Sequence, residues 1–293
     1  MPIKHSGLDR LLLILNAVGL IIAVLIVIIP LFYIVVASFM DPSVLLSQGL
    51  SFKVSDWTLE GYEMILTNPA MVRGFVNSVL YSTSFALITV TVSVFAGYAL
   101  SDQRLVGRKI FMTLFLITMF FGGGLVPTYL LVKNLDMIDT IWAIIIPGAV
   151  NVWNIILSRT FFRGVPNELR EAANVDGASE AKIFFQIVLP LSKPIIFVLA
   201  LYAFVGQWNS YFDAMIYLDN SKLHPLQLVL RSILIQNQVD PGMISDQLAM
   251  AEMKRLSEII KYAAIVISSL PLVIMYPFFQ KYFEKGVMVG SLK

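Results

Sequence analysis

The sequence predicts an all-α membrane protein that crosses the bilayer several times. Of its 293 residues 58% are apolar and only 14% are charged, whereas soluble domains are about 45–50% apolar and about 25% charged. Many of the apolar residues form continuous stretches long enough to cross a bilayer, which takes about 20 residues. Such stretches exclude the alternating strands of a membrane barrel, about ten residues each. Because every backbone group in lipid needs a partner within the chain, a helical bundle is expected.

Composition also excludes several functional classes. The chain has no cysteine, so it has no disulfide, thiolate nucleophile or cysteine metal site. Two histidines leave little for an imidazole metal cluster. High hydrophobicity excludes intrinsic disorder. We therefore expect a protein that is not an enzyme and has neither a cofactor nor a nucleic acid partner.

Six stretches are long and apolar enough to span a membrane. The first is far longer than the apolar core of a cleaved signal peptide, about 7–15 residues, so we expect it to be retained, with a kink at Pro30. A single transmembrane domain is therefore expected over residues 1–293. The expected spans are residues 11–39, 77–100, 110–132, 140–162, 194–218 and 258–279.

The third stretch contains three consecutive glycines, Gly122 to Gly124, followed by Pro127. Such a sequence can break a helix in mid-membrane, and broken helices often mark transport sites. Glycine also permits close helix packing, and the sequence leaves both interpretations open.

Lysine and arginine in alternate loops decide the orientation, since short loops rich in these residues stay cytoplasmic. With the N-terminus inside, thirteen of the 21 basic residues lie on the cytoplasmic side and seven outside. Both termini are therefore expected in the cytoplasm, and the protein in a bacterial cytoplasmic (inner) membrane. The outside set is Lys53, Arg73, Lys133, Lys222, Arg231, Lys254 and Arg255.

The internal loop 163–193 predicts a cytoplasmic helical hairpin. Pro166 suits the first position of a helix, where its missing N–H is not needed. Gly177 suits the left-handed conformation that ends a helix. We expect a second helix over residues 178–188 that stops before Pro190.

This loop resembles the EAA loop of ATP-binding-cassette importer permeases. The resemblance is carried by Glu-Ala-Ala at 171–173, Asp-Gly-Ala at 176–178 and Ile-Val-Leu-Pro at 187–190. The stretches 207–212 and 279–283 are similar to the carbohydrate-importing subgroup, which includes the inner maltose permease subunit and lipoprotein/aldouronate-type oligosaccharide permeases. The resemblance covers essentially residues 70–293.

The resemblance implies that the loop couples the chain to a separate ATPase. No Gly-x-x-x-x-Gly-Lys-[Ser/Thr] phosphate loop occurs in the sequence, so ATP hydrolysis is expected in another subunit. The implied partners are a second homologous permease, an ATPase dimer, an extracytoplasmic solute-binding protein, a sugar or oligosaccharide, and membrane lipid. The implied ATPase-coupling residues are Glu171, Ala172, Ala173, Asp176 and Gly177.

Polar residues within spans are costly and usually face the bundle interior. Amides next to aromatic rings suit a sugar pathway, because amides bind hydroxyls and rings lie against apolar sugar faces. Interhelical hydrogen bonds and interfacial aromatics explain the same residues equally well. The candidate substrate-pathway residues are Asn151, Asn154, Gln207, Trp208, Asn209 and Tyr211.

The expected function is that of a permease subunit forming half of a pore for sugar import. Five external basic residues would tolerate an acidic sugar or, equally, contact the binding protein: Arg73, Lys222, Arg231, Lys254 and Arg255. One alternative is a permease of the same type for an amino acid or phosphate. Another is an ion-coupled secondary transporter, for which Asp213 and Glu258 are the available acids.

Overall fold

The computed structural model describes residues 7–236 and 247–290, and it contains no named strand in those parts. Side chains at 236, 247–254, 256 and 281–290 are not described, nor are the two chain ends. The termini and the side chains at 281–283 therefore lie outside the described residues. The helices are α1 (Gly7–Ala37), α2 (Pro42–Gln48), η1 (Val54–Asp56), α3 (Glu60–Thr67), α4 (Pro69–Ser101), α5 (Arg108–Phe120), α6 (Leu125–Asn134), α7 (Trp142–Ile145), α8 (Val152–Arg163), α9 (Asn167–Val175), α10 (Glu180–Ile183), η2 (Phe184–Val188), α11 (Leu189–Leu191), α12 (Lys193–Trp208), α13 (Phe212–Tyr217), η3 (Ser221–Leu223), α14 (Leu226–Gln236) and α15 (Gln247–Gly290).

The chain forms two compact units. The first comprises residues 1–68 and 232–270, and the second comprises 69–231 and 271–293. Three helices are long and apolar enough to cross a membrane unaided: α1, α4 and residues 257–280 of α15. Two bent helix pairs raise the number to as many as five, all counted within the described residues.

In the first unit, α1 continues through Pro30 to Ala37. The segment after it is tied to α15 through Arg255, whose guanidinium lies 2.6 Å from Glu60 and 3.8 Å from Asp41. The Asp41 carboxylate also caps α2 by accepting a hydrogen bond from the Ser43 N–H. The Ser43 hydroxyl, and then the Arg255 charge, hold the pKa of Asp41 below its usual value.

The third expected span is broken at its glycines. Helix α5 ends at Phe120 and α6 begins at Leu125, with an angle of 111° between them. Gly124 has a φ of +83°, which favours glycine. Added Cβ atoms at Gly122 and Gly124 would meet nothing within 4 Å. Within this chain the glycines therefore serve the break and not close packing.

The fourth expected span, residues 140–162, is not one helix. It forms α7 and α8, separated by residues 146–151. Pro147 explains the separation, since proline disfavours helical geometry at the preceding residue and supplies no N–H. Helix α8 then begins at its own cap, where the Asn151 side chain accepts from the Asn154 N–H at 3.1 Å.

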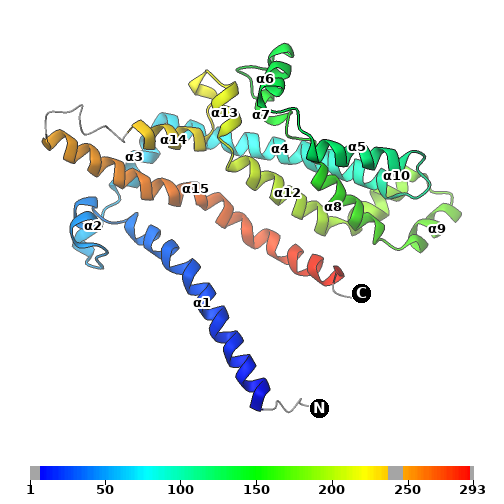
Figure 1. Cartoon of the computed structure of the whole chain (residues 1–293), viewed down its shortest axis with the longest axis horizontal. Helices are drawn as coiled ribbons and strands as arrows, with labels where there is room; N and C mark the ends of the chain where they lie inside the picture. The colour runs from blue at the N-terminus through cyan, green and yellow to red at the C-terminus, as the bar shows by residue number, and fades with distance from the viewer. Residues whose placement is uncertain (1–6, 237–246, 291–293) are drawn as a thin grey trace. The chain divides into compact units, whose positions relative to one another are not determined.

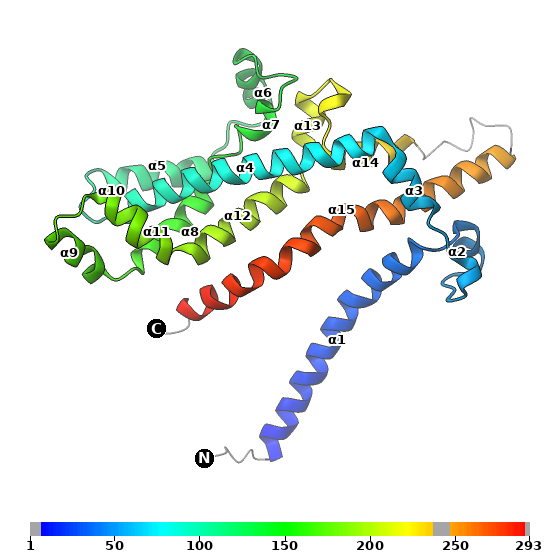
Figure 2. The same cartoon turned by 180° about the vertical axis from the view of Figure 1, so that it is seen from behind.

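The second unit is built around α4, which packs against both α8 and α12 (Figures 1 and 2). The buried face of α4 is rich in small residues that let helix backbones approach. At Gly97 the approach is so close that a Cβ would lie 2.5 Å from the Ser158 hydroxyl of α8. The small buried residues of this face are Gly74, Ser78, Ser82, Ala86, Thr89, Ser93, Gly97 and Ser101.

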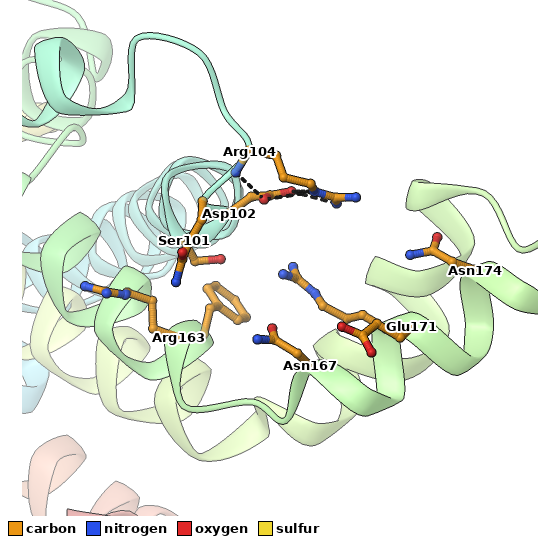
Figure 3. Close-up of a pocket in the computed structure, with 10 residues that line it drawn as sticks. Ser101, Asp102, Arg104, Arg163, Asn167, Glu171 and Asn174 are labelled. Carbon is orange, nitrogen blue, oxygen red and sulfur yellow. Dashed lines mark hydrogen bonds and ion pairs between the residues drawn. The ribbon is translucent and has the colours of Figure 1, made fainter.

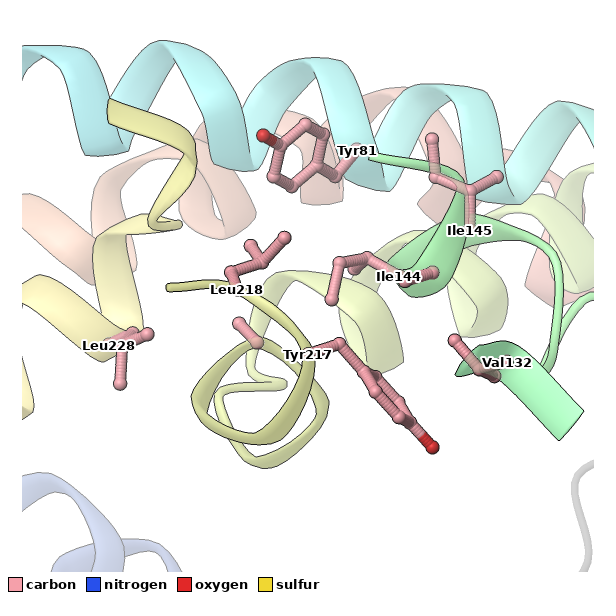
Figure 4. Packing of buried hydrophobic residues seen from close by; sticks show 9 residues of the cluster. Tyr81, Val132, Ile144, Ile145, Tyr217, Leu218 and Leu228 are labelled. Atoms are coloured by element: carbon pink, nitrogen blue, oxygen red, sulfur yellow. The ribbon is translucent and has the colours of Figure 1, made fainter. Parts of the chain in front are cut away.

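A separate apolar cluster packs α7 and α13 beside the N-terminal half of α4. Figure 4 shows Tyr81 of α4 above Ile144 and Leu218. The Tyr81 hydroxyl donates to the Leu223 carbonyl at 2.9 Å. This cluster holds the short helices α7 and α13 in place.

Candidate coupling hairpin and transport cavity

The loop 163–193 folds as the helical hairpin that its sequence predicts. The first arm, α9, starts one residue after Pro166, which occupies the N-cap position. The turn follows at Gly177, with a φ of +73° and open space around its Cα. Glycine is suited to this position because other residues pay a steric cost for left-handed geometry.

The second arm is longer than predicted. It does not stop before Pro190 but continues from α10 through the π-helical turn η2 into α11, ending at Leu191. A π turn changes the backbone hydrogen-bonding register, which accommodates the missing N–H of Pro190. The bend comes later, with 75° between this arm and α12.

The inner face of the hairpin is an apolar core. Ile183 is fully buried, and Phe184 packs against Phe162 and Val94 in the same cluster. Ala173 belongs to this buried cluster. The Ala173 side chain is therefore directed into the hairpin's own core in this chain, and its role in ATPase coupling stays a prediction.

The outer face of the hairpin is exposed. Glu171, Ala172, Asp176 and Gly177 are all accessible in this chain. Val175 stands beside them with 89% of its surface exposed. An apolar residue so exposed, next to a small residue and two acids, suits contact with another protein.

A pocket of about 350 Å³ lies between α9 and the segment that follows α4. Figure 3 shows the polar side chains of the two segments around it. Arg104 joins the segment to the hairpin, with its guanidinium 2.8 Å from Asp102 and 3.0 Å from Glu180. The lining residues are Ser101, Asp102, Gln103, Arg104, Phe162, Arg163, Asn167, Arg170, Glu171 and Asn174.

Charges at this pocket stabilise one another. The hydrogen bond from Arg104 holds the pKa of Asp102 below its usual value, against a smaller opposing effect of burial. The pKa of Arg104 is raised by the same hydrogen bond and by Glu180. Asp102 and Arg104 therefore stay charged at physiological pH, and the hairpin is held to the end of α4 by an ionic link.

A second cavity, about 340 Å³, lies among α4, α8 and α12. Three of the six candidate pathway residues line it together: Asn151, Asn154 and Gln207. The other lining residues are Phe85, Thr89, Trp153, Tyr202, Ala203, Gly206 and Ser210.

The remaining three candidates are not among the lining residues. Trp208 is fully buried and packs against Phe75 and Phe204. The Asn209 amide donates to the Val205 carbonyl of its own helix at 2.9 Å. The Tyr211 ring lies under the Arg231 guanidinium, 5.4 Å from the ring centroid. Consecutive helical residues point in different directions, which explains why these three do not share the cavity; their role in the substrate pathway stays a prediction.

Thr89, Tyr202 and Ser210 are cavity residues that the sequence did not single out. Tyr202 lies four positions before Gly206 on α12, and Ala203 lies four positions before Gln207, so these lining residues follow the helical repeat. Thr89 sits among many other small residues on α4, and nothing in its sequence context marks it. Within the described residues, no cluster of His, Cys, Asp and Glu could hold a metal ion.

The chain is similar to known proteins in sequence and in fold. The chain is 36% identical to the protein LplC of Bacillus subtilis over 92% of this chain and 90% of that protein. It is 37% identical to the polygalacturonan/rhamnogalacturonan transport system permease protein YtcP of the same organism, over 92% and 93%. A crystal structure of a bacterial ABC transporter that imports the acidic polysaccharide alginate contains a chain that matches with a TM-score of 0.83 and 31% identity, covering 96% of this chain and 99% of that one.

The fold is therefore that of a type I ABC importer permease, as the resemblance predicted. Residues 99–289 match the model of a family described as the binding-protein-dependent transport system inner membrane component. That range contains the hairpin and most of both cavities. The chain is a multi-pass membrane protein that belongs to this family of transport permeases.

Proposed function

We propose that this chain forms half of the pore of an ATP-driven importer of an acidic oligosaccharide. A hairpin whose inner face is anchored to α4 and α8, and whose outer face is exposed, carries the proposal. Membership of the family implies a partner permease, an ATPase and a solute-binding protein. Because the sequence has no phosphate-binding loop, ATP hydrolysis is assigned to the separate ATPase.

In this proposal α9 and the turn at Gly177 dock into the ATPase. Val175 supplies apolar contact, while Ala172 and Gly177 allow close approach. Glu171 lines the pocket beside α9 and receives a basic side chain of the ATPase. The hairpin and both termini then lie in the cytoplasm, in agreement with the distribution of basic residues.

Movement of the docked hairpin would pass to the pore helices. Ile183 and Ala173 share a buried cluster with Val94 of α4 and Leu199 of α12. Close-packed interiors transmit displacement, because they have few voids in which it can be absorbed. The same two helices line the cavity that contains Asn154 and Gln207. The docking hairpin and the cavity are therefore both packed against α4 and α12.

The substrate class follows from the relatives. One acts in a polygalacturonan/rhamnogalacturonan system and another belongs to an alginate importer. Of the external basic residues that would tolerate an acidic sugar, Arg255 is paired with Glu60 and Asp41, and the Lys254 side chain is not described. We assign attraction of an acidic sugar to Arg73, Lys222 and the solute-binding protein.

The test is Glu171→Lys in a complex reconstituted in proteoliposomes with its ATPase, partner permease and binding protein. Like-charge approach at an interface costs several kcal/mol, so sugar transport per ATP should fall at least about tenfold. Glu168→Lys is the matched control, because Glu168 is exposed on α9 but does not line the pocket. Equal transport by the Glu171 variant and wild type would refute the docking role.

A further inference from the structure

Four basic side chains gather where α5 meets α8. Arg108 is the first residue of α5, and Arg159 and Arg163 stand four positions apart on α8, which places them on one face of that helix. The two helices are in contact, and the charges of Arg108 and Arg163 both act on Arg159. Lys109 directly follows Arg108. These four residues are called the α5–α8 basic patch below.

The chain supplies no acid to this patch. In the parts that the structure describes, no carboxylate lies within ion-pair distance of any of the four side chains. Arg159 Nε donates to the Leu100 carbonyl at 3.1 Å, which satisfies a donor but leaves the charge in place. Arg104, in the same loop as the start of α5, is by contrast paired with Asp102 and Glu180. Like charges four positions apart on a helix repel, so an anion from outside the chain would stabilise the patch.

The patch lies at the expected level of the lipid head groups. The expected span 110–132 begins directly after Arg108 and Lys109, and the expected span 140–162 ends directly before Arg163. Both boundaries are on the side of the hairpin, because the hairpin loop starts at Arg163. The preference of cytoplasmic loops for basic residues explains why such residues occur here. It does not explain why they gather without an acid.

Helix α5 offers an apolar surface that starts at the patch. None of its 13 residues is buried in this chain, and it is about 20 Å long, more than half of the roughly 30 Å hydrocarbon core. Its exposed apolar side chains are Ile110, Phe111, Leu114, Leu116, Ile117, Met119 and Phe120. An apolar helix that begins at unpaired cations is complementary to a molecule with an anionic head and an apolar tail. The unpaired charge favours a lipid over a second subunit as the molecule that covers α5, because a phosphate group supplies the missing anion.

We infer that the α5–α8 basic patch binds the phosphate head group of an anionic phospholipid in the cytoplasmic leaflet, with the acyl chains along α5. Arg163 is exposed, and its guanidinium points away from Glu171 (Figure 3), so its planar fork can take two phosphate oxygens. Arg108 and Arg159 are partly buried and add attraction from behind. Basic pockets between membrane helices on the cytoplasmic side are known to hold such head groups. The inference goes beyond the proposed function and uses it only to name the leaflet.

The test is photo-labelling of the assembled complex in nanodiscs of neutral lipid. The probes are phosphatidylglycerol and phosphatidylcholine with the same photoactivatable acyl chains, and labelled peptides are mapped by mass spectrometry. One basic residue near the membrane surface changes the attraction of an anionic lipid about fivefold. Phosphatidylglycerol should therefore label residues 110–120 at least about fivefold more than phosphatidylcholine. Arg163→Gln should lower this ratio about fivefold, Lys109→Gln should give a similar fall, and Arg163→Lys should retain most of it.

Lys182→Gln is the matched control, because it removes one exposed cation from the hairpin, outside the patch. Its labelling ratio should equal that of wild type; a fall equal to that of Arg163→Gln would overturn the site. Equal labelling by the two lipids in wild type would also overturn it. Loss of the preference on adding inorganic phosphate would assign the patch to free phosphate instead of lipid, and protection of α5 from both probes would show that another subunit covers it. These readouts do not require sugar transport, so this inference and the proposed function fail separately.

Discussion

Gly97→Ala should loosen the contact between α4 and α8 that supports both cavities. The new Cβ would lie 2.5 Å from the Ser158 hydroxyl, 2.6 Å from the Ser158 Cβ and 2.8 Å from the Arg159 backbone nitrogen. Carbon contacts settle at about 3.5–4.0 Å, so the helices must separate by roughly 1 Å. Overpacking of this kind costs about 1–3 kcal/mol. The upper end is expected here, because a backbone atom cannot rotate away.

The assay is thermal unfolding of the purified complex in detergent, followed by tryptophan fluorescence. The unfolding midpoint should fall by several degrees in Gly97→Ala. Adding Ser158→Gly removes the two side-chain contacts and should recover part of this loss. Recovery should be incomplete, because the contact with the Arg159 backbone nitrogen remains. Gly19→Ala on α1 is the control, because its Cβ would meet nothing within 4 Å. A midpoint equal to wild type in Gly97→Ala, or an equal fall in Gly19→Ala, would refute the close-contact reasoning.

Three further predictions concern the hairpin. Gly177→Ala should destabilise its turn by about 1–2 kcal/mol through left-handed backbone strain alone, and lower sugar-stimulated ATPase activity in the complex; full stimulation would count against the turn. Ile183→Ala should cost about 2–5 kcal/mol, because it empties a fully buried site, and a thermal scan that matched wild type would contradict this. Folding lowers the pKa of Asp102 below its usual value of 3.8. The ionised carboxylate therefore stabilises the fold at pH values above 3.8, and this stabilisation is lost as the pH falls through the pKa of the folded state. The unfolding midpoint should therefore be insensitive to this group from pH 5 to 8 and fall below about pH 4, with a smaller fall in Asp102→Asn.

The sequence predicted the features that depend on local chemistry. Pro166 and Gly177 marked the start of α9 and its turn because each has a backbone preference that acts within a few residues. For the three glycines at 122–124 the sequence left a helix break and close packing both open, and the structure shows the break. The class of protein followed from composition and from the motif at 171–178.

Features set by packing were not predictable in the same way. Pro190 was expected to stop a helix, but the π turn before it absorbs the missing donor. Asn151, Asn154 and Gln207 share a cavity while Trp208 beside them is in the core, because orientation around a helix depends on the neighbouring helices. Thr89 was missed because the lack of a hydrogen bond can be seen only in three dimensions.

The central claim is that the α9 turn contacts an ATPase on the inner side of the membrane. Since the chain has no cysteine, Val175→Cys would carry its only thiol at an 89% exposed position. Val54→Cys, at an 86% exposed position in η1, is the control, because the distribution of basic residues predicts that this segment lies on the opposite side. In the assembled complex, a short bifunctional thiol–amine reagent should join Cys at 175 to the ATPase, while a membrane-impermeant thiol reagent applied to intact cells should label only the variant at 54. Labelling of the variant at 175 from outside, or no link to the ATPase, would contradict the account.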